Sequence, residues 1–93
     1  MRVFDATLQD GTVVLTNKSN KKVLLRLVTL HYEVTVLTIE DQRSIKTINE
    51  DKIIEKEIKS GEKIKVKSEL KNLKSISIVY TIDDRTFRED IEF

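Results

Sequence analysis

The chain has 93 residues, which is the size of one small domain, so residues 1–93 are treated as a single domain. Basic residues number 17 and acidic residues 16, and a chain this close to neutral lacks the strongly basic footprint of most nucleic-acid-binding domains. The complete lack of cysteine excludes disulfide scaffolds, Cys-based zinc sites and thiol nucleophiles.

The start of the chain predicts no signal peptide, because Arg2 and Asp5 interrupt any apolar run. No stretch approaches the ~20 apolar residues that a membrane helix needs, so we expect no membrane insertion. A cytoplasmic protein is predicted, with an extracellular or cell-surface location as the alternative if the chain is cut from an anchored parent. The composition, rich in Lys, Glu and Ile with no Cys and one Met, also resembles that of hyperthermophile proteins, and an AT-rich genome would give the same bias.

The first 21 residues predict a pair of short strands. Residues 2–8 alternate between an inward face and an outward face that includes Val3, as half-buried strands do. A turn at Asp10 and Gly11 leads to a second strand at 12–16, and a polar loop follows at 17–21. The inward side chains of the first strand are Phe4, Ala6 and Leu8.

The stretch 22–39 is the longest apolar one and exceeds the length of an ordinary strand. It is either two strands with a bend near 28–31 or one long strand that serves two sheets. Its second half alternates regularly, with Leu30, Tyr32, Val34 and Val36 inward. A loop at 40–43 and a short strand at 44–48 are expected next.

Residues 49–59 fit either a strand or a helix. A helix capped by Asn49 and ended by Gly61 would place Glu50 and Glu57 on its apolar stripe, so the strand is preferred. A lysine-alternating strand is expected after the turn at Gly61.

The last third, from Lys63 to Phe93, predicts a β-meander with a tight turn at Asp83 and Asp84. Glu89 falls in the inward phase of the final strand, so either a bulge turns it outward or it is an inward charge that protects a sheet edge, and edge protection is preferred. The predicted inner face consists of Ile64, Val66, Ile76, Ile78, Tyr80, Ile82, Phe87, Ile91 and Phe93.

About seven short strands with turns every 8–12 residues indicate an all-β fold, an antiparallel β-sandwich. The segments 14–23, 58–66 and 76–84 resemble the strand rhythm of immunoglobulin-like and fibronectin-III-like sandwiches. That resemblance implies a binding or structural module, by analogy of fold. The alternative fold is a small barrel of the OB type with one helix near 49–59.

Chemistry-bearing patterns are scarce. With only two glycines, the chain has no phosphate-binding loop. His31 is the single histidine, and its outward phase predicts a solvated strand side chain rather than a general base. We therefore predict a protein that is not an enzyme and that uses no cofactor and no metal.

Six lysines are the candidate binding residues. A stripe of alternating lysines can contact phosphates, but exposed strand lysines more commonly confer solubility and prevent aggregation. The set consists of Lys18, Lys21, Lys22, Lys63, Lys65 and Lys67.

The predicted function is a non-catalytic protein–protein interaction or structural module, with a protein partner or a second copy of the chain bound through an edge strand. The contact surface would be the lysines of 63–67 or the apolar outward residues Val3, Val14 and Val79. Nucleic-acid binding through the lysines is the second hypothesis. A cell-surface or filament-associated domain is the third, supported by the glycosylation sequon that begins at Asn17.

Overall fold

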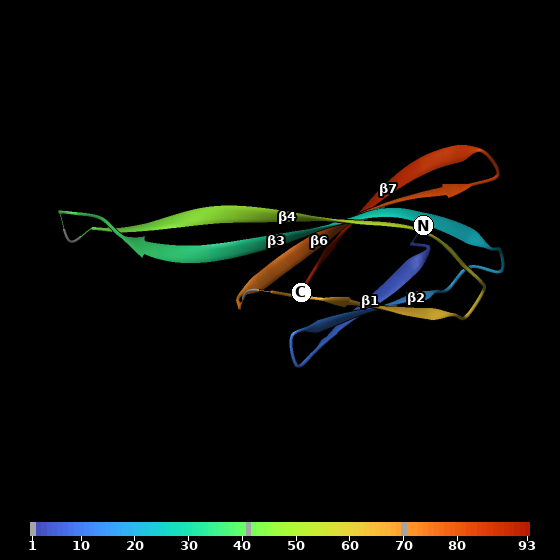
Figure 1. Ribbon diagram of the computed structural model, residues 1–93, viewed down its shortest axis with the longest axis horizontal. Helices are drawn as coiled ribbons and strands as arrows, with labels where there is room; N and C mark the ends of the chain where they lie inside the picture. The colour runs from blue at the N-terminus through green and yellow to red at the C-terminus, as the bar shows by residue number, and fades with distance from the viewer. Residues whose placement is uncertain (1, 41, 70) are drawn as a thin grey trace.

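The computed structural model describes residues 2–40, 42–69 and 71–93, and every regular element in these ranges is a β-strand. The strands form two antiparallel sheets with the orders β1-β2-β5 and β4-β3-β6-β7 (Figure 1). The predicted all-β sandwich is therefore confirmed, and the alternative barrel with a helix near 49–59 is wrong. The strands are β1 Phe4–Gln9, β2 Thr12–Asn17, β3 Val23–Leu37, β4 Arg43–Ile58, β5 Lys63–Lys67, β6 Leu73–Ile82 and β7 Arg85–Glu92.

Two tight turns form at the predicted places. Asp10 and Gly11 join β1 to β2 with φ values of 49° and 77°, and Asp83 and Asp84 join β6 to β7 with 49° and 65°. Positive φ at both central residues matches the right-handed twist of a two-residue hairpin, and Asp and Gly tolerate it best.

The core lies between the two sheets. Its largest fully buried side chains include Tyr32, Phe4, Leu15 and Ile58, and so both sheets contribute to it. Val3 is also buried, and the prediction that it faces outward is wrong. Val3 precedes β1 and lines an apolar hollow together with residues of β6 and β7, so the strand alternation does not extend to it.

The predicted meander of the last third is wrong in one connection. β5 pairs with β2 in the three-stranded sheet, and only β6 and β7 form a hairpin. The chain therefore crosses from one sheet to the other between β5 and β6. Of the predicted inner face, Phe87 and Phe93 are exposed, because β7 is the edge strand of the larger sheet and the smaller sheet covers it incompletely.

The 22–39 stretch forms one strand in one sheet, which contradicts both sequence-based alternatives. A bulge lies between Leu25 and Leu27, so Arg26 has no partner in the strand register. On the neighbouring strand β4, Glu55 has a φ of 47°. The bulge shifts the side-chain phase and explains the apolar residues on both faces of the early part. The expected strand at 44–48 and the ambiguous segment 49–59 are two parts of the single strand β4.

The far halves of β3 and β4 project beyond the sandwich. β6 pairs with β3 only as far as Tyr32, whereas β4 continues to pair up to Leu37 and Arg43. The paired segments 33–37 and 43–47 therefore form a two-stranded projection, the hairpin arm, which points away from the other strands (Figure 1). The molecule measures 53 × 26 × 22 Å, and its radius of gyration of 15.2 Å exceeds the about 12 Å expected for a compact domain of this length.

Candidate functional site

Three of the predicted binding lysines share one face of the smaller sheet. Lys63, Lys65 and Lys67 are exposed at alternate positions of β5, and none forms a salt bridge within residues 2–40, 42–69 and 71–93. This face therefore presents three charges in a row without neutralising partners. Their cross-strand neighbours are small side chains rather than aromatic rings: Thr16, Val14 and Thr12.

The other three lysines lie on the connection between β2 and β3. Lys21 Nζ pairs with Asp83 Oδ2 at 2.7 Å, and Lys22 Nζ with Glu57 Oε2 at 3.4 Å. Both partners belong to the larger sheet or its turn, so these two lysines point away from β5. Lys18, which is exposed and directly follows β2, donates its backbone nitrogen to the carbonyl oxygen of Val3, on the side of β2 where β1 lies. The structure thus does not unite the six lysines in one site.

The glycosylation sequon is not accessible. Asn17 is the last residue of β2 and has an exposed fraction of 0%, and its side-chain nitrogen donates to the carbonyl oxygens of Lys21 and Ile58. Its oxygen accepts hydrogen bonds from the backbone nitrogen and the hydroxyl of Ser19. A glycan on this nitrogen is incompatible with the fold, so the prediction of a usable loop sequon is wrong.

His31 lies in a polar row on the outer face of the larger sheet. Its Nδ1 is 2.7 Å from Asn49 Oδ1 and its Nε2 is 2.8 Å from Ser77 Oγ. His31 faces outward as predicted, but it is half-buried rather than fully solvated, because side chains of both neighbouring strands bond the ring.

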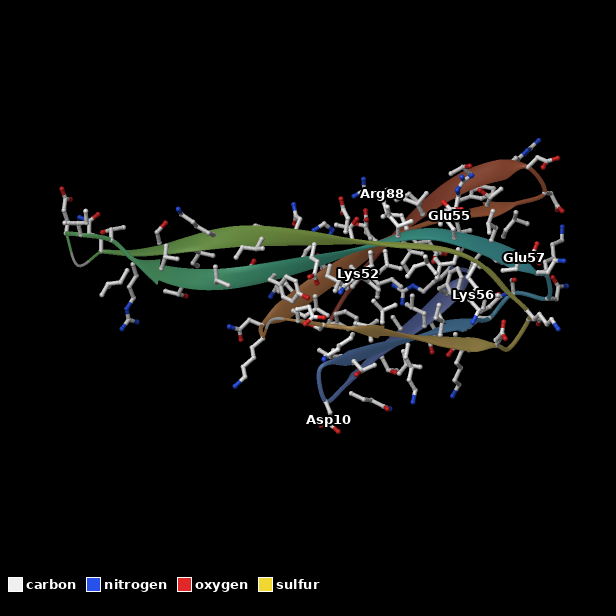
Figure 2. The ribbon with its side chains drawn as sticks, viewed as in Figure 1. Asp10, Lys52, Glu55, Lys56, Glu57 and Arg88 are labelled. Atoms are coloured by element: carbon white, nitrogen blue, oxygen red, sulfur yellow. The ribbon has the colours of Figure 1, made fainter. Side chains whose placement is uncertain are left out.

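The row also contains Ser77, Asp90 and Arg88, and their hydrogen bonds show which group donates to which. Ser77 Oγ donates to Asp90 Oδ1 at 2.7 Å. Arg88 donates from Nε to the same Asp90 oxygen and from Nη2 to Ser77 Oγ. The hydrogen bond from Ser77, followed by that from Arg88, lowers the pKa of Asp90 below its ordinary value. Nucleophilic catalysis by serine requires the opposite order, in which the hydroxyl donates to the imidazole and the acid orients the imidazole. The row instead links β4, β3, β6 and β7, and Figure 2 shows Arg88 on the side turned away from the smaller sheet.

Glu89 points inward as its phase predicts. Its carboxylate accepts hydrogen bonds from the backbone nitrogens of Val3 and Phe4 and from the Tyr80 hydroxyl. Burial of the phenol, then the charge of Glu89 and the hydrogen bond to it, raises the pKa of Tyr80 to about 12. Glu89 therefore connects the edge strands β1 and β7 of the two sheets.

An apolar hollow lies beside this connection. It has a volume of about 310 Å³ and is lined by Val3, Tyr80, Ile82 and Phe87. Phe87 stacks on Tyr80 with ring centroids 5.7 Å apart, so the hollow has an aromatic wall. A second hollow of about 500 Å³ lies on the outer face of the larger sheet, over Leu27, Ile53 and Val79. Both could accept apolar side chains of a partner.

The hairpin arm and its tip hold three highly exposed apolar side chains, and Ile53, on the part of β4 outside the arm, is 80% exposed. Leu37, Ile39 and Ile45 have exposed fractions of 67%, 104% and 71%, and Ile48 at the base of the arm is 41% exposed. Cross-strand register places Leu37 and Ile45 on one face of the arm, and Ile48 on the opposite face with Tyr32. At the base of the arm, Glu33, Thr35 and Ile45 line a hollow together with Asn72, Leu73 and Lys74. Beyond this base, Figure 2 shows the arm extending away from the other strands.

Sequence reasoning missed this surface. Val34 and Val36 follow Tyr32 on its face and were therefore expected in the core, although they lie where no second sheet is present. The only local signal was the excessive length of the 22–39 stretch. Val14 and Val79, predicted as outward contact residues, are half-buried.

Within the described part of the chain, no group of three or more acidic, histidine or cysteine side chains is placed to hold a metal ion. None of the described residues forms a helix long and apolar enough to cross a membrane. The chain matches no protein-family model and no curated protein.

Proposed function

We propose that this protein is a non-catalytic protein–protein interaction module whose hairpin arm contacts the partner. The observation that carries the proposal is the arm itself, which projects from the sandwich and exposes apolar side chains on two faces. An isolated two-stranded hairpin is marginally stable in water, and clustered exposed apolar groups mark interaction sites.

The arm offers two kinds of contact. Covering a large aliphatic side chain contributes about 1.5–3 kcal/mol, so Leu37, Ile39 and Ile45 together form a substantial apolar contact. The free backbone groups along β4 can also pair with an added strand. Both contributions are made by side chains and backbone that the sandwich does not need for its own core.

We also infer that the sandwich is immunoglobulin-like. The order β4-β3-β6-β7 supports this inference, because in immunoglobulin variable-type domains the strand after C joins the sheet formed by C, F and G. Such modules commonly bind other proteins, which agrees with the proposed function by analogy of fold.

Site-specific photo-crosslinking in cells tests the role of the arm. A photoreactive amino acid is placed at Leu37 or Ile45, and at Thr7 on the outer face of the smaller sheet as the matched exposed control. We expect protein adducts from the two arm positions and none from Thr7. Adducts from Thr7 alone, or none from the arm while the chain is folded, would contradict the proposal.

Nucleic-acid binding is the second candidate, supported by the unneutralised row Lys63, Lys65 and Lys67. Fluorescence anisotropy with labelled DNA and RNA at several salt concentrations tests it. If the row contacts phosphates, replacing all three lysines by glutamine should lower affinity and reduce the salt slope by about 1 per lysine. An unchanged slope would exclude the row as the contact.

A further inference from the structure

We infer that the arm's partner is a second copy of this chain, which pairs antiparallel through β4 across a twofold axis at Ile48. This inference rests on the proposed function and specifies the partner. The pairing would join the two four-stranded sheets into one continuous sheet.

β4 is the edge best suited to self-pairing. β5 is also an edge strand, but pairing two β5 strands about Lys65 would oppose Lys65 to itself and Lys63 to Lys67. Like charges directly opposite each other destabilise a strand pair. The edges β1 and β7 are already connected to each other through Glu89.

In one register of the pair, charged residues of one β4 strand lie opposite residues of opposite charge on the second β4 strand. In a twofold antiparallel pair centred on Ile48, Lys46 lies opposite Glu50 of the second copy, and Glu50 opposite Lys46. Ile48, which is 41% exposed in the single chain, then packs against its own equivalent on the axis. No like-charged residues lie opposite each other in this register.

Neighbouring registers are less favourable. Centring the pair on Asn49 opposes Lys46 to Lys52, and centring it on Lys46, Glu50 or Asp51 opposes that charge to itself. A pair centred on Thr47 brings Arg43 opposite Asp51 without conflict. However, it leaves Ile48 facing a lysine, so the axis at Ile48 is preferred.

The side chains involved are available to a partner. Lys46 is exposed and forms no salt bridge with a described residue. Glu50 uses Oε1 to accept a hydrogen bond from the Tyr32 hydroxyl and to contact Lys52 Nζ at 3.8 Å. Its second oxygen is therefore oriented by these contacts and can accept from the lysine of the second copy.

Charge reversal tests the register on the purified full chain. In Lys46→Glu or Glu50→Lys, two attractive pairs become repulsive, and we expect each variant alone to dimerise about 10-fold or more weakly in sedimentation equilibrium. Mixing the two variants restores opposite charges at both pairs, so the mixture should associate nearly as well as the unchanged chain. The double variant in one chain should do the same.

Controls separate these effects from folding. Circular dichroism and urea unfolding establish that each variant is folded, and Lys65→Glu on β5 is the matched reversal that should leave dimerisation unchanged. A chain that stays monomeric at every concentration overturns self-pairing, while arm adducts with other proteins would still support the interaction module. A dimer that is insensitive to these reversals, or that is rescued by reversing Arg43 and Asp51 instead, overturns the register.

Discussion

The side-chain amide of Asn17 donates a 2.9 Å hydrogen bond to the carbonyl oxygen of Ile58, joining the last residue of β2 to the last residue of β4. These strands belong to different sheets, so the bond fastens the sandwich at one end. The same side chain also binds Lys21 and Ser19, which means that both of its polar atoms are satisfied while fully buried. The loop after β2 is thereby fixed on the core.

Asn17→Ala should therefore destabilise the protein markedly. It leaves the buried carbonyl group of Ile58 without this donor, and we expect the free energy of unfolding to fall by about 2–4 kcal/mol. Urea denaturation measures the change. The exposed neighbour substitution Asn20→Ala is the control and should alter stability by less than about 0.5 kcal/mol. Similar values for the two variants would show that the hydrogen bonds of Asn17 contribute little.

The arm should be dispensable for folding of the sandwich. Replacing residues 35–45 by Asn-Gly joins Val34 to Lys46, which lie opposite each other in the hairpin, through a favoured two-residue turn. Because the core lies entirely outside the arm, the free energy of unfolding should change by less than about 1 kcal/mol. Urea unfolding and circular dichroism check this. Loss of cooperative unfolding would mean that the arm is part of the folding unit.

Local sequence signals predicted the strands and turns well. Alternation between neighbours places side chains on two faces of any strand, and Asp10 with Gly11 or Asp83 with Asp84 supplies the positive φ of a tight turn. These features depend on residues that are close in the sequence. The inward phase of Glu89 followed from the same alternation.

The relations between distant strands could not be predicted in this way. Alternation assigns Val34 to the face of Tyr32, but whether a second sheet lies beneath that face depends on how far the smaller sheet, β1-β2-β5, extends. The sheet to which β5 belongs is likewise set by its pairing with β2, about 50 residues earlier in the chain. The pairing of lysines 21 and 22 with acids of the larger sheet has the same non-local origin.

Asp90 should make the stability of the fold sensitive to acidic pH. Because the hydrogen bonds from Ser77 and Arg88 lower its pKa in the folded chain, the ionised form stabilises the fold above the ordinary carboxyl pKa. This stabilisation is lost as the pH falls through the lowered folded value. The stability difference between the unchanged chain and Asp90→Asn should accordingly shrink between pH 6 and pH 2. Asp5→Asn on exposed β1 is the control, and an equal pH dependence of both variants would contradict the assignment.

Tyr80 should make the fold sensitive to alkaline conditions. Its pKa is about 12 in the folded chain against 10 ordinarily, so the protonated phenol stabilises the fold fully below pH 10. That contribution is lost as the pH rises from 10 to 12, and it amounts to about 3 kcal/mol for a shift of this size. Comparing the unchanged chain with Tyr80→Phe over this range isolates this contribution, since the two chains differ only in the phenol. Parallel stability curves for the two chains would contradict the raised pKa.

Glu89→Gln separates the effect of burial on the pKa of Tyr80 from the effect of the Glu89 charge. Removing the charge eliminates the Coulomb contribution but leaves the burial of the phenol, so the pKa of Tyr80 should fall while staying above 10. An amide is also a weaker acceptor than a carboxylate for the backbone nitrogens of Val3 and Phe4. Hydrogen exchange at these two amides should therefore accelerate, while exchange in the centre of β3 stays unchanged. Titration of the tyrosine absorbance and exchange measured by NMR check both effects. An unchanged pKa of Tyr80 would mean that burial alone raises it, and unchanged exchange at Phe4 would show that Glu89 does not hold the start of β1 in place.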